Sequence, residues 1–283
     1  MEEAIRKADI LIEALSYIKK FRGKTFIIKY GGSILLEKSI RERVIQDLVF
    51  LYFMGINVVL VHGGGPNINK ALKKMNLKSE FYKGIRITDA NTFLVVESEL
   101  MKLNTLLAKE LEELGAKVGG VSGKEDLVFA RKKEEDIDLG LVGEVADINL
   151  PKFKELLDKN HLVVLAPLGR DSQGQVYNIN ADEVASFLSY KISAEKLVFL
   201  TNVKGILRDP ADEDSLISSI KEEEVKELIE KKVISEGMIP KVTAGLSAVE
   251  KGTKKVHIID AKIPHALLLE IFTDKGIGTE IIK

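Results

Sequence analysis

Lys29-Tyr30-Gly31-Gly32-Ser33 and Val61-His62-Gly63-Gly64-Gly65-Pro66 are the two stretches that decide the fold. Each ends a short apolar run, 25–30 in the first case and 58–61 in the second, of the kind that forms a buried strand. Glycine lets backbone N–H groups approach an anion, and a helix that begins just beyond adds its dipole. Both turns are therefore candidate oxyanion sites. The alternative, that the glycines simply permit sharp strand-to-helix turns, stays open for each.

The same alternation of strands and helices continues along the chain. Periodicity predicts helices at 4–20, 38–54, 67–75, 91–114, 151–159, 181–192, 221–232 and 240–251. Short apolar runs predict further strands at 117–121, 127–130, 162–166, 197–200 and 255–259. Strands that alternate with helices predict an α/β fold with a mainly parallel sheet and helices on both faces. Ligands of such sheets bind beyond the carboxyl ends of the strands.

Composition excludes several classes of function. The 283 residues carry 42 Lys plus Arg and 43 Asp plus Glu, a net charge of −1 that gives no support for a nucleic-acid or membrane partner. The absence of cysteine excludes disulfides, thiol catalysis and cysteine metal sites, and four histidines argue against a histidine-rich metal cluster. With neither a signal-peptide pattern nor an apolar run of about 18 residues, we expect a cytoplasmic protein.

The common phosphate-binding motifs do not fit the two glycine turns. A dinucleotide fingerprint that starts at Gly63 needs a third glycine where Ile68 stands. A P-loop that ends in Gly23-Lys24-Thr25 needs its first glycine where Ile18 stands. The protein-kinase signatures are absent as well. A phosphate-handling enzyme built on this chain must use another scheme.

Three charged residues are candidates for that scheme. Lys29 ends an apolar strand next to the first glycine turn, where an ammonium group can stabilise a transferring phosphoryl group. Asp182 lies at the start of a predicted helix in Asn178-Ile179-Asn180-Ala181-Asp182, and Lys241 follows Pro240 in the first turn of another. For each, an ordinary role stays open: a solvated lysine, or a carboxylate favoured by the helix dipole.

Taken in order, the motifs resemble the amino acid kinase family over nearly the whole chain. The matching segments are 29–33, 61–66, Gly84-Ile85-Arg86-Ile87-Thr88, 178–182, Leu200-Thr201-Asn202-Val203-Lys204-Gly205 and Gly237-Met238-Ile239-Pro240-Lys241. Within the family, the segments at 84–88, 178–182 and 237–241 look like the branch that phosphorylates the γ-carboxylate of N-acetyl-L-glutamate in arginine biosynthesis. The closing segment 257–279 resembles the arginine-sensitive members of that branch.

The resemblance implies a fold and a role for each matched residue. The fold is an αβα sandwich with an open, mainly parallel central sheet, and the cofactors are ATP and Mg²⁺, with no side chain assigned as a metal ligand. Lys29 and Lys241 would stabilise the transferring phosphoryl group, and Asp182 would orient both. The ATP-binding positions are Gly31, Gly32, Thr201, Asn202 and Gly205. The acetylglutamate-binding positions are Gly64, Gly65, Arg86 and Asn178.

The resemblance also implies three segments and a mode of regulation. Residues 1–20 would be an oligomerisation helix, 21–172 the acetylglutamate-binding lobe and 173–283 the ATP-binding lobe with an arginine site. The helix would interlace dimers into a hexamer, a trimer of dimers, although it could instead cap its own lobe. Arginine is the expected effector, and a PII-type signal protein is a possible further partner. The matched effector positions are Tyr17, His257, Glu270 and Gly276.

A few positions depart from the family pattern. Asn202 stands where Asp is usual, Glu236 where Gly is common, and Ser33 and Ile34 where Asn-Ala is frequent. Two rival functions remain. One is a kinase of the same family that acts on another amino acid, carboxylate or phosphate acceptor, and the other is a non-catalytic sensor of nucleotide and arginine. A dinucleotide-dependent oxidoreductase is disfavoured by Ile68.

Overall fold

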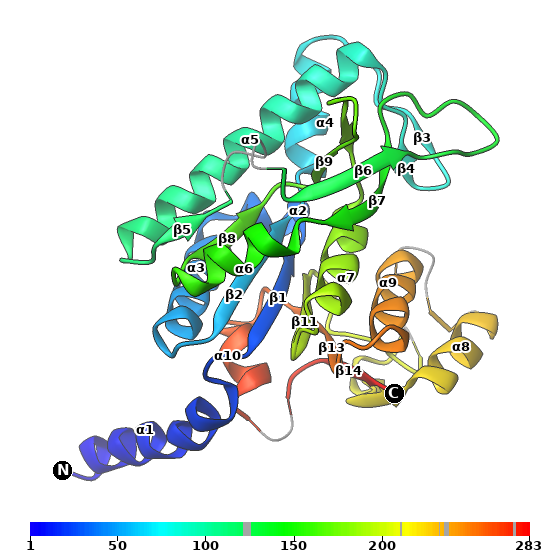
Figure 1. The fold of residues 1–283 in the computed structure, drawn as a ribbon. Coiled ribbons are helices and arrows are strands. Elements are labelled where there is room, and N and C mark those ends of the chain that lie inside the picture. The colour runs from blue at the N-terminus through cyan, green and yellow to red at the C-terminus, as the bar shows by residue number, and fades with distance from the viewer. Residues whose placement is uncertain (121–125, 210, 232, 235–237, 274–275) are drawn as a thin grey trace.

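An eight-stranded sheet forms the centre of the computed structural model, which describes residues 1–120, 126–209, 211–231, 233–234, 238–273 and 276–283 (Figure 1). The strand order is β12-β14-β13-β11-β1-β2-β8-β5. In that order the strands are Ser219–Lys221, Thr279–Ile282, Lys255–Asp260, Lys196–Thr201, Thr25–Tyr30, Asn57–His62, Leu162–Leu165 and Val118–Gly119. All neighbours pair in parallel except β13 and β14. The predicted mainly parallel sheet is confirmed.

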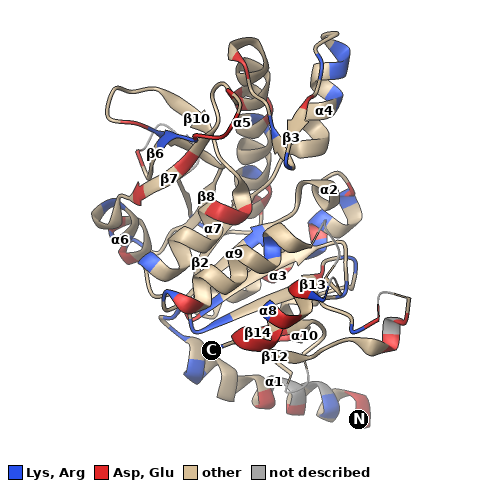
Figure 2. Cartoon of the chain, turned by 90° about the vertical axis from the view of Figure 1, so that its right-hand side faces the viewer, with Lys and Arg blue, Asp and Glu red and all other residues tan. Residues whose placement is uncertain are grey.

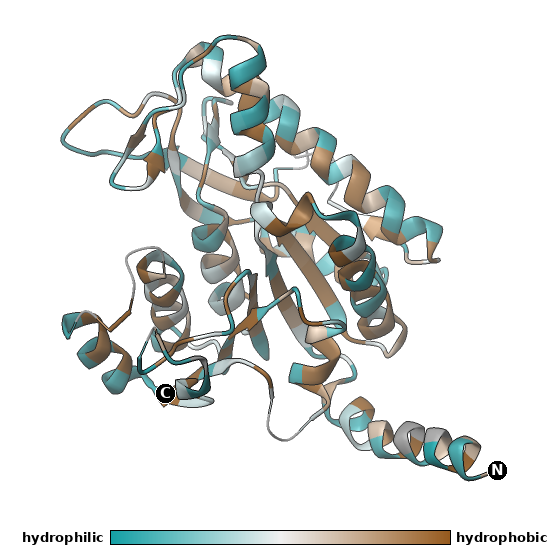
Figure 3. Cartoon of the chain, turned by 180° about the vertical axis from the view of Figure 1, so that it is seen from behind, coloured by the Kyte–Doolittle hydropathy of each residue, from teal (hydrophilic) through white to brown (hydrophobic). Residues whose placement is uncertain are grey.

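Helices cover both faces of this sheet and complete the αβα sandwich. One face packs against α6 (Leu150–Asp158), α7 (Ala181–Lys191), α8 (Glu222–Glu230) and α9 (Ile239–Glu250). The other packs against α3 (Lys38–Phe53), α5 (Ala90–Glu113) and α10 (Ala266–Ile271). Figure 3 shows the hydrophobic strands in the centre of the molecule between these layers.

Successive side chains of β1 point to opposite faces of the sheet. Ile27 belongs to the core under α7, whereas Phe26, Ile28 and Tyr30 belong to the core under α3. Because Lys29 is two residues from Ile27, it shares the α7 face. The strand therefore delivers a buried lysine to its carboxyl end on the side where α7 begins.

A smaller sheet lies beside the central one and was not predicted. Its order is β10-β9-β6-β7, formed by Val176–Asn178, Leu168–Arg170, Val128–Lys132 and Gly143–Ile148. Two further short strands, β3 (Phe81–Tyr82) and β4 (Ile85–Arg86), form a hairpin, and η1 (Glu213–Ser215) is a 3₁₀ turn. The polar turn at 171–175 joins β9 to β10, so the lobe boundary placed after residue 172 lies within a hairpin of the small sheet.

The first helix, α1 (Glu2–Phe21), projects from the body of the molecule (Figures 1 and 3). Acidic residues in its first turn and basic ones in its last complement the helix dipole, and Figure 2 shows both signs interspersed along it. Its apolar residues Ile5, Ile12 and Leu15 are 53%, 70% and 43% exposed. None of the helices within the described ranges has the length and apolar character that a membrane span requires.

Candidate active site

The two glycine turns lie against each other at the carboxyl ends of β1 and β2. The Gly31 N–H donates to the Leu200 carbonyl at 3.1 Å, and the Gly63 N–H donates to the Tyr30 carbonyl at 2.9 Å. A Cβ atom on Gly32 would lie only 2.9 Å from the Gly64 nitrogen and 3.0 Å from the Gly65 nitrogen. The two backbones thus meet at a distance that no side chain permits, so the glycines do more than allow sharp turns.

Helices begin directly at both turns. The sequence predicted no helix between residues 20 and 38, but α2 (Gly32–Leu35) starts inside the first turn. In the second turn, α4 (Gly65–Lys74) starts at Gly65 with Pro66 in its first turn. The first amides of a helix have no intrahelical partner and carry the positive end of its dipole. The start of α4 therefore offers donors to an anion bound beside Gly64 and Gly65.

The Gly32→Ala variant is expected to be destabilised and nearly inactive, because its methyl group would meet backbone nitrogen atoms that cannot turn away. The expected loss in free energy of unfolding is about 1–3 kcal/mol. A Cβ atom on Gly65 would have no neighbour within 4 Å, so Gly65→Ala should keep its stability while its activity falls. Urea unfolding and steady-state kinetics of both variants check this. Equal losses of stability in Gly32→Ala and Gly65→Ala would contradict the close contact between the backbones of the two turns.

Lys29, Asp182 and Lys241 converge on one point. Lys29 Nζ lies 2.7 Å from Asp182 Oδ1, and Lys241 Nζ lies 3.5 Å from Asp182 Oδ2. Asn180 caps α7 by accepting the Asp182 N–H at 2.8 Å, which fixes Asp182 in the first turn of the helix. Strand β1 and helices α7 and α9 thus bring two ammonium groups to the two oxygens of one carboxylate.

Burial strengthens the electrostatic interaction between Asp182 and the two lysines. Lys29 and Asp182 are 6% and 5% exposed. Burial alone would raise the pKa of Asp182, but the ammonium groups of Lys29 and Lys241 outweigh it and hold the pKa below its usual range. Two cations that share one anion leave a net positive charge at the carboxyl end of β1. Such a cluster can stabilise negative charge that develops on a transferring group.

Arg86 is a buried cation whose partners are neutral. It is 8% exposed, and its guanidinium donates to the hydroxyl of Ser79 and to Asn69 Oδ1, the latter at 2.6 Å. Its guanidinium carbon lies 4.7 Å from the centre of the Phe81 ring. Within the described part of the chain, no carboxylate forms an ion pair with it. Burial lowers its pKa, so a bound carboxylate would relieve an uncompensated charge.

Asn178 lies close to Arg86 through Thr88. The Asn178 amide donates to the Thr88 hydroxyl at 3.4 Å, and that hydroxyl donates to the Arg86 carbonyl at 2.9 Å. The predicted acceptor-binding residues Arg86 and Asn178 are therefore brought together by β4 and β10. Asn69 and Ser79, which hold the guanidinium, were missed because nothing in their local sequence marks them.

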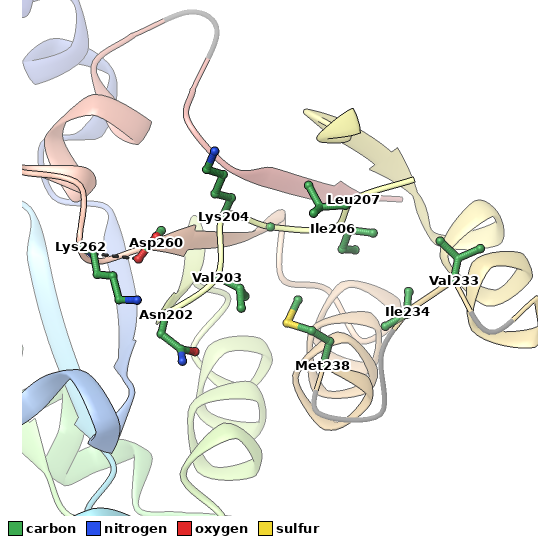
Figure 4. Close-up of a pocket in the computed structure, with 11 residues that line it drawn as sticks. Asn202, Val203, Lys204, Ile206, Leu207, Val233, Ile234, Met238, Asp260 and Lys262 are labelled. Atoms are coloured by element: carbon green, nitrogen blue, oxygen red, sulfur yellow. Dashed lines mark hydrogen bonds between the residues drawn. The ribbon is translucent and has the colours of Figure 1, made fainter. Parts of the chain in front are cut away.

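A pocket of about 420 Å³ opens beside the 201–205 segment (Figure 4). It is lined by Asn202, Val203, Lys204, Gly205, Ile206, Leu207, Val233, Ile234, Met238, Asp260 and Lys262. Apolar side chains form one wall and charged ones the other, the combination that a nucleotide base and its phosphates require. Thr201 stays buried beside it and accepts the Val203 N–H at 3.0 Å.

Gly205 is required by its position in this pocket. Its φ is +148°, and a Cβ atom there would lie 2.5 Å from the Thr279 hydroxyl oxygen. That hydroxyl accepts the Ile206 N–H at 2.8 Å and so ties the segment to β14. The predicted ATP-binding residues Asn202 and Gly205 thus line one cavity. Gly237 and Glu236, which the motif analysis also singled out, lie outside the described residues.

His62 is buried between the second glycine turn and α5. The fully buried ring keeps the pKa at about 4, well below the usual value, because burial disfavours the imidazolium. Since the unfolded chain takes up this proton near pH 6.5 and the folded protein does not, stability is lost as pH falls from 6.5 towards 4.

The expected contribution of His62 over this range is about 3 kcal/mol in free energy of unfolding. Urea unfolding at several pH values should therefore give a steeper loss for the wild-type protein than for His62→Asn, which has no proton to take up. If the free energy of unfolding fell equally with pH in the wild-type protein and in His62→Asn, a neutral His62 ring in the folded protein would be contradicted.

The predicted effector residues His257, Glu270 and Gly276 also come together. Glu270 Oε1 lies 2.6 Å from His257 Nδ1, and its Oε2 accepts the N–H groups of Ile277 and Gly278. Gly276 has φ +61°, and a Cβ atom there would lie 2.8 Å from Glu270 Oε2. Burial would raise the pKa of Glu270, but these donors lower it, so the carboxylate is charged.

The structure adds Lys196 to this cluster. Its Nζ lies 2.8 Å from His257 Nε2, and burial lowers its pKa to about 8. Tyr17 reaches the same region from α1, where its ring packs edge-on against Phe272 with centroids 5.5 Å apart. The last turn of α1 therefore contacts the segment that follows Glu270.

The family model described as "Amino acid kinase family" matches residues 24–260. The chain belongs to the amino acid kinase family. It is 48% identical to the acetylglutamate kinase of Carboxydothermus hydrogenoformans, and the match covers 99% of each chain. As a member with such full-length kinase relatives, it is a phosphotransferase.

Solved structures of family members and their relatives share the fold. The N-acetylglutamate synthase of Neisseria gonorrhoeae, complexed with coenzyme A and N-acetyl-glutamate, superposes with a TM-score of 0.87 at 24% identity. The match covers 98% of this chain but 63% of the synthase. Carbamate kinase of Giardia lamblia, bound to AMP-PNP, gives 0.67 at 18% identity over 92% of this chain and 98% of that one. At such identities the likeness concerns the fold alone.

Proposed function

We propose that this kinase transfers the γ-phosphoryl group of ATP to the γ-carboxylate of N-acetyl-L-glutamate, a step of arginine biosynthesis. The observation that carries the proposal is the convergence of Lys29 and Lys241 on Asp182 beside two interlocked glycine turns. The full-length likeness to acetylglutamate kinases supports the choice of acceptor.

The chemistry needs no general base. A γ-carboxylate with an ordinary pKa of about 4.3 is already ionised at neutral pH, so it can attack phosphorus directly. In-line transfer then depends on positioning and on stabilising the charge of the transferring group. Lys29 and Lys241 are the groups we assign to that charge, and Asp182 holds both ammonium groups together.

The acceptor would lie between the second glycine turn and Arg86. The amides of Gly64 and Gly65 would bind its γ-carboxylate, and Arg86 would pair with its α-carboxylate. A planar guanidinium suits a carboxylate because two N–H groups can bind it at once. Asn178 would bind a remaining polar group of the acceptor. This assignment explains a buried guanidinium that neutral side chains hold in place.

ATP would occupy the pocket at 201–205, with its phosphates reaching Gly31 and Gly32. The described residues contain no cluster of three or more acidic, histidine or cysteine side chains suited to a metal ion. Both oxygens of Asp182 already face lysines. We assign Mg²⁺ to the ATP phosphates and water, where it would neutralise phosphate charge. Of the proposed acceptor-binding residues, Gly64, Gly65 and Arg86 belong to the segment 21–172 and Asn178 to the segment 173–283, which also contains the residues that line the pocket.

Regulation by arginine is part of the proposal. Glu270, His257 and Gly276 form a charged, buried site, and Tyr17 approaches it from α1. The exposed apolar residues of α1 favour contact with a second copy over capping of its own lobe, because most of the helix projects from the body. A hexamer interlaced by these helices would couple the effector site to assembly.

One assay tests the proposed function. ADP release would be measured with N-acetyl-L-glutamate, glutamate, aspartate, carbamate and UMP as acceptors, with and without arginine, alongside the mass in solution. We expect turnover with N-acetyl-L-glutamate, inhibition by arginine and a hexamer. Turnover with another acceptor in its place would overturn the substrate, and insensitivity to arginine would overturn the regulation.

A further inference from the structure

His62 links the second glycine turn to α5 through two contacts. Its Nδ1 lies 3.1 Å from the Gly63 carbonyl oxygen, and its Nε2 lies 3.2 Å from Asn104 Nδ2. The same Asn104 amide donates to the Val164 carbonyl of β8 at 3.3 Å. His62 and Asn104 are both 0% exposed. The turn is therefore connected to a long helix and to a central strand by buried polar groups.

These contacts define which ring nitrogen carries the proton. A carbonyl oxygen accepts but cannot donate, so the contact with Gly63 requires the hydrogen on Nδ1. An amide nitrogen donates but cannot accept, so Nε2 must present its lone pair to Asn104. Both neighbours thus select the neutral Nδ1–H form of His62. Because the pKa of the ring is about 4, His62 stays neutral at neutral pH.

The contact with Gly63 sets the direction of the next amide. The described chain contains no cis peptide bond, so the Gly63 C=O and the Gly64 N–H point to opposite sides of one planar unit. Because the carbonyl points to the buried His62 ring, the Gly64 N–H points away from it. Leu100 and Leu103 of α5 close the turn from the same side, since a Cβ atom on Gly64 would lie 2.7 Å and 3.3 Å from their methyl groups.

We propose that His62, oriented by Asn104, is a positioning residue that aims the Gly64 N–H at the acceptor carboxylate. The inference rests on the proposed function, in which Gly64 binds that carboxylate. Glycine has no side chain to limit the rotation of its peptide units, so the direction of this donor needs an external constraint. Misdirecting a preorganised donor weakens acceptor binding without altering the nucleotide pocket.

Two matched variants separate the two contacts. In His62→Asn, the amide nitrogen can take the place of Nδ1 and keep the donor to Gly63. In His62→Gln, the longer side chain places its amide near Nε2 and keeps the contact with Asn104 instead. We expect the Gln variant to raise the KM for N-acetyl-L-glutamate about tenfold with an unchanged KM for ATP. The Asn variant should stay within about threefold of wild type.

A purely structural role predicts a different pattern. Both variants would then lose stability, and the KM for the acceptor would not separate them. The His161→Asn variant is the control, because His161 Nδ1 also lies 3.2 Å from a backbone carbonyl, that of Leu156, but outside the site. It should leave both KM values unchanged. Equal acceptor KM values in His62→Asn and His62→Gln would overturn the inference.

¹⁵N NMR of histidine-labelled protein tests the same inference without turnover. We expect a pyrrole-like Nδ1 and a pyridine-like Nε2 for His62, and a shift toward the Nε2–H form in Asn104→Leu. A wild-type ring protonated at Nε2 would overturn it. If wild-type protein did not phosphorylate N-acetyl-L-glutamate, the proposed function would fail, while the tautomer and its response to Asn104→Leu would still decide whether His62 holds the turn.

Discussion

Replacing Lys29 with methionine is expected to lower kcat by about 10²–10³-fold. The side chain is 6% exposed and its Nζ lies 2.7 Å from Asp182 Oδ1, so Asp182 and the surrounding packing hold the ammonium group in place. Methionine keeps the apolar length of the lysine stem and removes the charge. With half of the cationic pair gone, Lys241 alone of the two lysines remains to stabilise the transferring phosphoryl group. Steady-state ADP release at saturating substrates measures the loss.

The controls for Lys29 concern folding. Its removal leaves Asp182 buried with one lysine at 3.5 Å, and an uncompensated buried charge destabilises a protein. The Lys29→Met/Asp182→Asn double variant removes that charge as well, so it should recover stability while it stays inactive. Lys24→Met changes an exposed lysine just before the same strand and should be fully active. Wild-type turnover by a folded Lys29→Met enzyme would rule out its assigned role.

Replacing Arg86 with lysine is expected to raise the KM for N-acetyl-L-glutamate about 10²-fold and to leave the KM for ATP unchanged. Lysine keeps the charge but cannot contact Asn69, Ser79 and a bound carboxylate at once, and it loses the planar contact with Phe81. Arg131→Lys is the matched control, because Arg131 is an exposed residue paired with Glu144. It should not change the KM for either substrate.

A truncated acceptor tests the partner of Arg86 directly. N-acetyl-4-aminobutyrate retains the carboxylate that accepts the phosphoryl group and lacks the α-carboxylate. The wild-type enzyme should lose as much kcat/KM on this acceptor as Arg86→Lys loses on N-acetyl-L-glutamate. Arg86→Lys should then discriminate little between the two acceptors, since changes to the two members of one pair are not additive. Additive losses would show that Arg86 binds some other group.

The parts of the fold that follow from local sequence were predicted well. The apolar runs of β1 and β2 and the periodic helices α3 and α5 lie within one or two residues of their predicted bounds. Burial of both faces of a strand gives a continuous apolar run, and burial of one face of a helix gives a periodic one. The strands β7, β9 and β10 were missed. They are short or partly exposed, and pairing with one another, which no local pattern encodes, holds them in a sheet.

The candidate site likewise contains residues that the sequence indicated and residues that it did not. Lys29 and Lys241 were singled out by position, at the end of an apolar strand and in a first helical turn where a cation opposes the dipole, and Asp182 by its place in a motif with two amides. Their catalytic roles came from the resemblance to the family. Asn69, Ser79 and Asn104 were not found, since each lies in an ordinary helix or loop and acquires its role through a residue 7 to 42 positions away. Supporting residues of this kind depend on tertiary structure.

The central claim is that two lysines, held by one aspartate, stabilise the phosphoryl group between two interlocked glycine turns. The most direct measurement is a crystal structure with ADP, Mg²⁺, aluminium fluoride and N-acetyl-L-glutamate. We expect aluminium fluoride between the turns at Gly32 and Gly64, within hydrogen-bonding distance of Lys29 Nζ and Lys241 Nζ. Aluminium fluoride bound out of reach of both lysines, with each still paired to Asp182, would contradict it.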